Sequence, residues 1–137
     1  MPIIFQEKTI NHMKVFKFGG ASLESVERIQ QVAKILQAFP EEKLLIVISA
    51  MGKTTNELEK VAQNYFMRKR EIAAQLLFNV EQQHLQVAEG LLGNREHPLF
   101  TQLQQFFTEA EWTLGEKPLR NYDYYYDQLV SLGELLS

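Results

Sequence analysis

Two short stretches of this chain combine residue types that suit the binding of phosphate groups. The first is KFGGASL, residues 17–23, where Lys17 and the pair Gly19-Gly20 separate an apolar segment from a helix-like pattern. Glycine lets a backbone N–H approach a ligand closely, and the start of a helix adds unpaired N–H groups and partial positive charge. The alternative is a tight turn with a solvated lysine, because short glycine motifs recur by chance.

The second stretch is SAMGKTTNEL, residues 49–58. Its Gly-Lys-Thr run imitates the end of a P-loop, but that loop requires a further glycine where Val47 stands, so a P-loop is excluded. What remains is a set of polar residues next to a helix start: Ser49, Thr54, Thr55 and Asn56. Their hydroxyl and N–H groups could hold a carboxylate or a phosphate. The plainer alternative is that Thr54 only caps the helix.

Both stretches follow segments that are predicted to be strands. Residues 13–18 alternate in polarity, and residues 44–48 form the continuous apolar run that is typical of a parallel sheet. Between them, apolar residues recur at helical spacing behind Ser22, which is predicted to be the N-cap. A right-handed βαβ unit is therefore expected. Its two glycine-containing loops should meet at one edge of the sheet, so they could share one site.

The remainder of the chain is predicted to be helical. Helices are expected within residues 54–65, 72–91, 98–110 and 122–136. Thr54 and Glu57 match a capping box at the start of the first of these, and Pro98 suits the first turn of the third. His84 is expected to be a core or edge histidine, and the tyrosines within residues 122–126 a packing or dimer surface.

Composition excludes several classes of function. The chain has 137 residues, no cysteine and a formal net charge of -3, which excludes cysteine-ligated zinc and argues against a nucleic-acid partner. No apolar run approaches the ~18 residues of a membrane span. The three histidines lack metal-ligand spacing, so no metal ligand is assigned. Residues 1–12 are expected to be a short extension without signal-peptide features, and the protein is expected to be cytoplasmic.

Three motifs in order resemble those of aspartate kinases, members of the amino-acid kinase family. Residues 17–23 resemble the opening Lys-Phe-Gly-Gly-Thr-Ser-Val motif, and residues 49–56 resemble the second loop. Residues 131–134 resemble the Ser-x-Gly-Glu segment. The resemblance implies an α/β fold, part of a three-layer αβα sandwich, with a short parallel sheet followed by several helices. It also implies transfer of the γ-phosphate of ATP, with Mg²⁺, to the side-chain carboxylate of L-aspartate.

The resemblance further implies roles for individual residues. Lys17 would neutralise the transferring phosphoryl group, and Phe18, Gly19 and Gly20 would contribute to ATP binding. The substrate-binding residues would be Ser49, Thr55 and Glu134, with Glu134 binding the aspartate ammonium group. The chemistry is coherent, because phosphoryl transfer depends mainly on positioning and positive charge. A carboxylate nucleophile is already ionised at pH 7, so no general base is required.

The chain is expected to be a piece of a longer protein. Residues 13–137 would form the N-terminal part of an amino-acid kinase domain, with the nucleotide-binding half and the regulatory ACT domains absent. The piece alone is expected to be inactive and to self-associate, and the enzyme is expected to be a homo-oligomer. Two alternatives stay open: a non-catalytic binding module, and another amino-acid kinase that acts on glutamate or carbamate.

Overall fold

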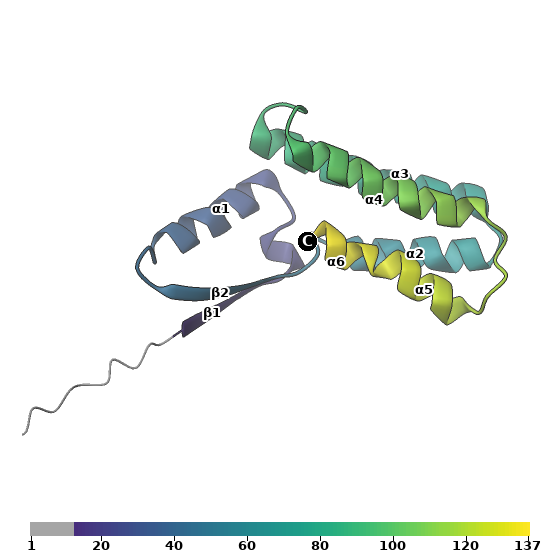
Figure 1. Cartoon of the computed structure of the whole chain (residues 1–137), viewed down its shortest axis with the longest axis horizontal. Coiled ribbons are helices and arrows are strands. Elements are labelled where there is room, and N and C mark those ends of the chain that lie inside the picture. Colours follow the sequence, from purple (N-terminus) through teal and green to yellow (C-terminus); the bar gives the residue numbers. More distant parts are fainter. Residues whose placement is uncertain (1–12) are drawn as a thin grey trace, which may run out of the picture.

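The computed structural model describes residues 13–137 and has a sheet part and a helical part (Figure 1). The predicted extension, residues 1–12, lies outside the described residues. In the sheet part, β1 (Met13–Phe18) pairs in parallel with β2 (Lys43–Ile48), and Lys17 stands opposite Val47. The predicted α/β class and the parallel βαβ unit are confirmed. In the described part of the chain the sheet has two strands.

One face of this sheet is covered by the helix α1 (Val26–Gln37). Because side chains alternate along a strand, Phe16 and Phe18 lie on the covered face and pack with Leu23 and Val32. The opposite face carries Val15, which is 62% exposed. The chain therefore supplies one helical layer to the sheet within residues 13–137, and the second face of the sheet is open to solvent.

The start of α1 differs from the prediction. Ser22 belongs to a short 3₁₀ turn, Gly20–Ser22, and the N-cap is Ser25, whose hydroxyl accepts a hydrogen bond from the Arg28 N–H. Within the turn, the N–H of Leu23 donates to the Gly20 carbonyl at 3.0 Å. Leu23 is thereby held in the small core beneath the sheet, and the α-helix begins only after this contact is made.

The helical part lies beyond the carboxyl ends of the strands (Figure 1). It consists of α2 (Thr54–Phe66), α3 (Arg70–Leu92), α4 (Pro98–Gly115), α5 (Tyr122–Val130) and α6 (Leu132–Leu136). Pro98 is the first residue of α4, as predicted. The predicted helix 122–136 is divided at Ser131, which keeps right-handed helical angles (φ -61°, ψ -20°), so the interruption is slight.

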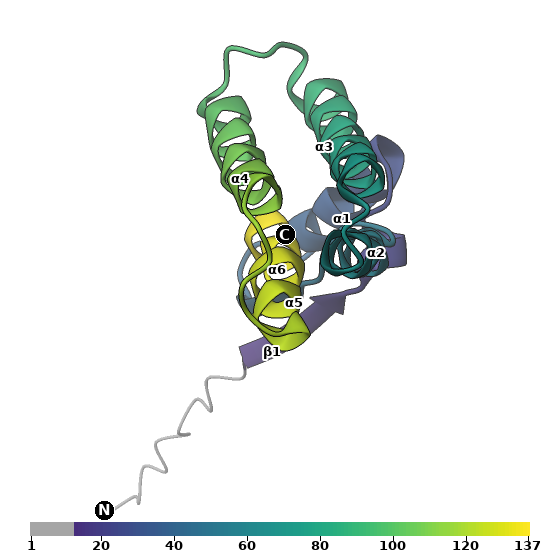
Figure 2. The same cartoon turned by 90° about the vertical axis from the view of Figure 1, so that its right-hand side faces the viewer.

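The main core is built around α2, which packs on both α3 and α5, while α4 packs on α3 (Figure 2). Tyr65 and Phe107 are among its largest fully buried side chains. Tyr125 is buried edge-on against Tyr65, with ring centroids 5.1 Å apart. At least this tyrosine of the predicted surface cluster is therefore part of the interior.

His84 is buried in the same core, as predicted. Its Nδ1 lies 2.7 Å from the Val80 carbonyl oxygen, whereas its Nε2 has no hydrogen-bond partner among residues 13–137. Burial lowers the pKa of His84, and the contact with the Val80 carbonyl partly opposes this. The neutral imidazole is therefore the form that the folded core favours.

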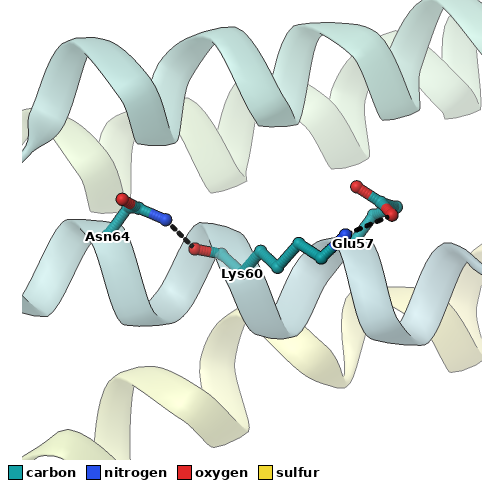
Figure 3. A network of polar contacts seen from close by, with 3 residues as sticks. All are labelled: Glu57, Lys60 and Asn64. Atoms are coloured by element: carbon teal, nitrogen blue, oxygen red, sulfur yellow. Dashed lines mark hydrogen bonds and ion pairs between the residues drawn. The ribbon is translucent and has the colours of Figure 1, made fainter.

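The predicted capping box at the start of α2 is wrong. Lys53 occupies the N-cap position, and Thr54 is the first helical residue. The Thr54 hydroxyl is buried and donates to the Met51 carbonyl at 2.6 Å. Glu57 instead accepts a hydrogen bond from Lys60 at 2.9 Å, on the solvent side of α2 (Figure 3). The hydroxyl of Thr54 therefore stabilises the turn that precedes α2 and does not cap the helix.

No helix in the described part of the chain is both long and apolar enough to cross a membrane.

Candidate functional site

The two glycine-containing loops meet at the carboxyl edge of the sheet. The parallel ladder continues one residue past the strands, because the N–H of Ser49 donates to the Phe18 carbonyl at 3.0 Å. Beyond it, the N–H of Gly52 donates to the Gly20 carbonyl, also at 3.0 Å. The expectation that the two loops share one edge is therefore confirmed.

Gly20 is required by this meeting of the loops. A Cβ atom at Gly20 would lie 2.3 Å from the Gly52 carbonyl oxygen and 3.0 Å from that of Ala50. Both neighbours are backbone atoms, which cannot move aside as a flexible side chain could. Gly52 itself has a positive φ of 55°, which other residues rarely adopt. By contrast, a Cβ atom at Gly19 would meet nothing within 4 Å.

A cleft of about 410 Å³ opens where the loops meet. Of the residues predicted from sequence, Gly20, Ser49, Thr55 and Glu134 line it. The full lining comprises Gly20, Val47, Ile48, Ser49, Ala50, Gly52, Lys53, Thr55, Asn56 and Glu134. The cleft thus combines hydroxyl, amide, ammonium and carboxylate groups with the first turn of α2.

Glu134 reaches the cleft from the distant end of the sequence, on α6. Gly133 makes this approach close: a Cβ atom there would lie 3.7 Å from the Thr55 hydroxyl oxygen and 3.5 Å from Leu58 Cδ1. Gly133 is buried, whereas Glu134 is exposed to solvent. The Gly-Glu pair therefore packs α6 against α2 with its first residue and presents a carboxylate with its second.

The remaining predicted site residues do not line the cleft. Phe18 is buried in the small core under α1, and Gly19 lies in the turn before the 3₁₀ segment. Lys17 is exposed on the open face of the sheet, opposite Val47 in the register. Val47 does line the cleft. Because paired residues of parallel strands point to the same face of the sheet, the side chain of Lys17 lies next to that wall of the cleft.

Two lining residues with polar side chains, Lys53 and Asn56, were given no role in the predicted site. Both belong to the second motif, and Lys53 directly precedes α2. Parallel strands place the whole following loop at the edge of a sheet. Every polar residue between Ser49 and the first turn of the next helix was therefore a candidate. This signal pointed to Asn56, and it could also have identified Lys53.

The cleft suits an anionic ligand that also carries an ammonium group. The first turn of an α-helix has backbone N–H groups without intrahelical partners, which favour phosphate or carboxylate. Lys53 adds a positive charge at this point, and Glu134 places a negative charge on another wall. Within residues 13–137, no group of three or more histidine, aspartate or glutamate side chains is arranged to hold a metal ion.

Comparison with known proteins relates this chain to one protein family. Residues 12–137 match the amino acid kinase family. Aspartokinase 2, chloroplastic, of Arabidopsis thaliana is 37% identical over 128 residues, which cover 90% of this chain and 22% of that protein. Aspartokinase 1, chloroplastic, of the same plant is 36% identical over 129 residues, covering 90% and 21%. The aspartokinase of Geobacillus stearothermophilus is 49% identical over 51 residues, covering 36% and 12%. The chain therefore spans about a fifth of the length of these plant relatives.

Proposed function

Because this chain belongs to the amino acid kinase family, we propose that residues 13–137 form the N-terminal part of an aspartate kinase domain. The observation that carries the proposal is the single cleft shared by both glycine-containing loops and Glu134. The relatives named aspartokinase, at 36 and 37% identity over 90% of the chain, support it. The proposed partners are ATP with Mg²⁺ and L-aspartate, and the remainder of a longer protein would complete the nucleotide site.

In the proposed reaction, a side-chain carboxylate oxygen of aspartate attacks the γ-phosphorus of ATP. The bond from that phosphorus to the bridging oxygen breaks, and the products are 4-phospho-L-aspartate and ADP. No proton has to be removed from the nucleophile, since the carboxylate is ionised at neutral pH. The protein must therefore align the reactants and offset negative charge, which is the usual requirement of phosphoryl transfer.

The residues present fit the phosphate groups of ATP. Gly19 leaves its Cβ position open, so a phosphate could approach its backbone N–H. Gly20 holds the two loops together through its carbonyl. Lys53 and the first turn of α2 add positive potential to the cleft. Bound MgATP would supply the phosphoryl group, and the cleft residues would hold and orient its phosphates.

In the proposed complex, the aspartate would lie between the second loop and α6. Ser49 and Thr55 offer hydroxyl donors to a carboxylate, and Glu134 offers a carboxylate to the ammonium group. The two ends of an amino acid are thereby bound by groups of opposite character. Lys17, beside Val47 on the open face of the sheet, is proposed to offset the charge on the transferring phosphoryl group.

The test of this function is a kinase assay on the full-length protein that contains residues 1–137. ADP formation should depend on L-aspartate, and hydroxylamine should trap the acyl phosphate as a hydroxamate. Glutamate and carbamate serve as comparison substrates. Turnover that favours one of them would assign the protein to another amino-acid kinase, and no turnover with any of the three would favour a non-catalytic binding module.

A second prediction concerns Glu134. In the full-length protein, Glu134→Gln should raise the KM for aspartate about ten-fold, because the charge-assisted hydrogen bond to the ammonium group is lost. The free energy of unfolding should change by no more than about 0.5 kcal/mol, since the side chain is exposed. Glu41→Gln, at an exposed position between α1 and β2, is the matched control. An equal KM in both variants would remove Glu134 from aspartate binding.

A further inference from the structure

A second polar cavity lies at the other end of the helical part from the cleft. Here the link between α2 and α3 meets the link between α4 and α5 (Figure 1). The cavity has a volume of about 410 Å³ and is lined by Arg68, Arg70, Lys117, Pro118 and Leu119. We call these five residues the basic corner. Because α2 has 13 residues, its length places the corner about 20 Å from the cleft.

The charge of the basic corner is opposite to that of the whole chain. All three ionisable side chains that line the cavity are cations, whereas the chain carries a formal net charge of -3. Glu71 and Glu116 are close in sequence, but neither lines this cavity. Three cations around one cavity repel one another, and an anion between them would relieve that repulsion.

The loop that supplies Lys117 is held in place by two tyrosines. The Tyr65 hydroxyl donates to the Glu116 carbonyl at 3.1 Å, and Arg70 also donates to that carbonyl. The Tyr125 hydroxyl accepts from the N–H of Leu119 at 2.8 Å and from that of Arg120 at 3.2 Å. The backbone of this loop is therefore preformed, and a ligand would not have to order it.

Arg68 occupies a position that glycine would normally fill. Its φ is +61°, and the adjoining Lys69 N–H donates to the Asn64 carbonyl at 2.9 Å, which closes the end of α2. This is the left-handed C-terminal position of a helix, where a side chain costs about 1 kcal/mol relative to glycine. Strained residues of this kind tend to cluster at ligand sites. A ligand that binds the guanidinium group would explain why arginine stands at this position in place of glycine.

We propose that the basic corner binds a small anion that carries two or more phosphate groups. Arginine engages phosphate oxygens through two parallel hydrogen bonds, whereas lysine acts as a point charge. The three cations exceed the charge of a single phosphate, and the cavity has the size of a small-molecule site. The inference goes beyond the proposed kinase function and does not depend on it, because none of these residues lines the cleft.

The first test is calorimetric titration of the 137-residue chain with inorganic pyrophosphate. Arg68→Gly should weaken binding about ten-fold, because one charge-assisted contact is lost. The same substitution should raise the melting temperature, because glycine relieves the left-handed strain. Failure to fold is therefore not an explanation for lost binding. Arg28→Gln, which removes an exposed arginine from α1, is the matched control and should leave the affinity unchanged.

The second test locates the bound anion by backbone amide NMR shifts. Pyrophosphate should shift residues 67–70 and 116–120, and it should still do so in the cleft variant Lys53→Gln. Comparing pyrophosphate with ADP separates the two sources of this chemistry: equal affinity indicates recognition of the phosphates alone, and tighter binding of ADP indicates a nucleotide. The proposal is overturned by shifts confined to residues 19–22 and 49–56, by equal losses in Arg68→Gly and Arg28→Gln, or by the absence of binding.

Discussion

Lys17→Met should reduce aspartate-dependent ADP formation by the full-length protein about 10²–10³-fold. This is the usual loss when one preorganised group that stabilises charge in a transition state is removed. Lys17 stands at the carboxyl edge of the sheet, beside a wall of the cleft, and no covalent catalyst is needed in the proposed reaction. The unfolding free energy should hardly change, because the side chain is exposed.

Lys43→Met is the matched control for Lys17. It lies on the same open face of the sheet but at the opposite end, opposite Met13 in the register. Lys43→Met should retain near wild-type turnover, because the proposal assigns the effect to the lysine beside the cleft and not to the total positive charge of this face. Comparable turnover in the two variants would exclude Lys17 from the mechanism.

Gly20→Ala should destabilise the 137-residue chain by about 1–3 kcal/mol, the usual penalty for inserting an atom into a close-packed position. The new Cβ would overlap the Gly52 carbonyl oxygen, so one loop would have to move away from the other. The hydrogen bond from Gly52 to Gly20 would then lengthen or break. Chemical denaturation followed by circular dichroism measures the change, as a lower midpoint with an unchanged slope.

Gly19→Ala is the natural comparison, because the two glycines are adjacent and differ only in their surroundings. Gly19 has a φ of -81° and an open Cβ position, so alanine should be accepted there within about 1 kcal/mol of the wild type. Equal destabilisation by the two substitutions would show that the loops do not meet through Gly20.

The arrangement of the strands could be predicted from sequence because it depends on patterns that span several residues. The alternation over residues 13–18 and the apolar run after Lys43 determined two parallel strands. Parallel strands then placed both loops at one edge, which brought Gly20 and Ser49 together. These predictions needed no knowledge of tertiary contacts, only the geometry of a βαβ unit.

Choices between single hydrogen bonds could not be predicted in this way. Ser22 and Ser25 are both acceptable N-caps for α1. The burial of Leu23 favours Ser25, because the helix can begin only after Leu23 has reached the core. Thr54 could cap α2 or turn back to the Met51 carbonyl, and its burial favoured the latter. Such alternatives differ by about 1 kcal/mol, so a tertiary contact that the local sequence does not reveal is enough to select one.

The two cores differ in the number of buried side chains, and this difference affects how the cleft unfolds. Within residues 13–137, the core under the sheet contains three buried apolar side chains, whereas the core of the helical part contains sixteen. The sheet part therefore has far less burial to oppose local unfolding. The N–H of Gly52 donates to the Gly20 carbonyl and the N–H of Ser49 donates to the Phe18 carbonyl, and these hydrogen bonds hold together the two loops that form the cleft. The amide protons of Ser49 and Gly52 should exchange with solvent when the sheet part alone opens, long before α2 and α3 unfold. The cleft is therefore the first structure to be lost, and a ligand that bridges both loops would slow that exchange in proportion to its occupancy.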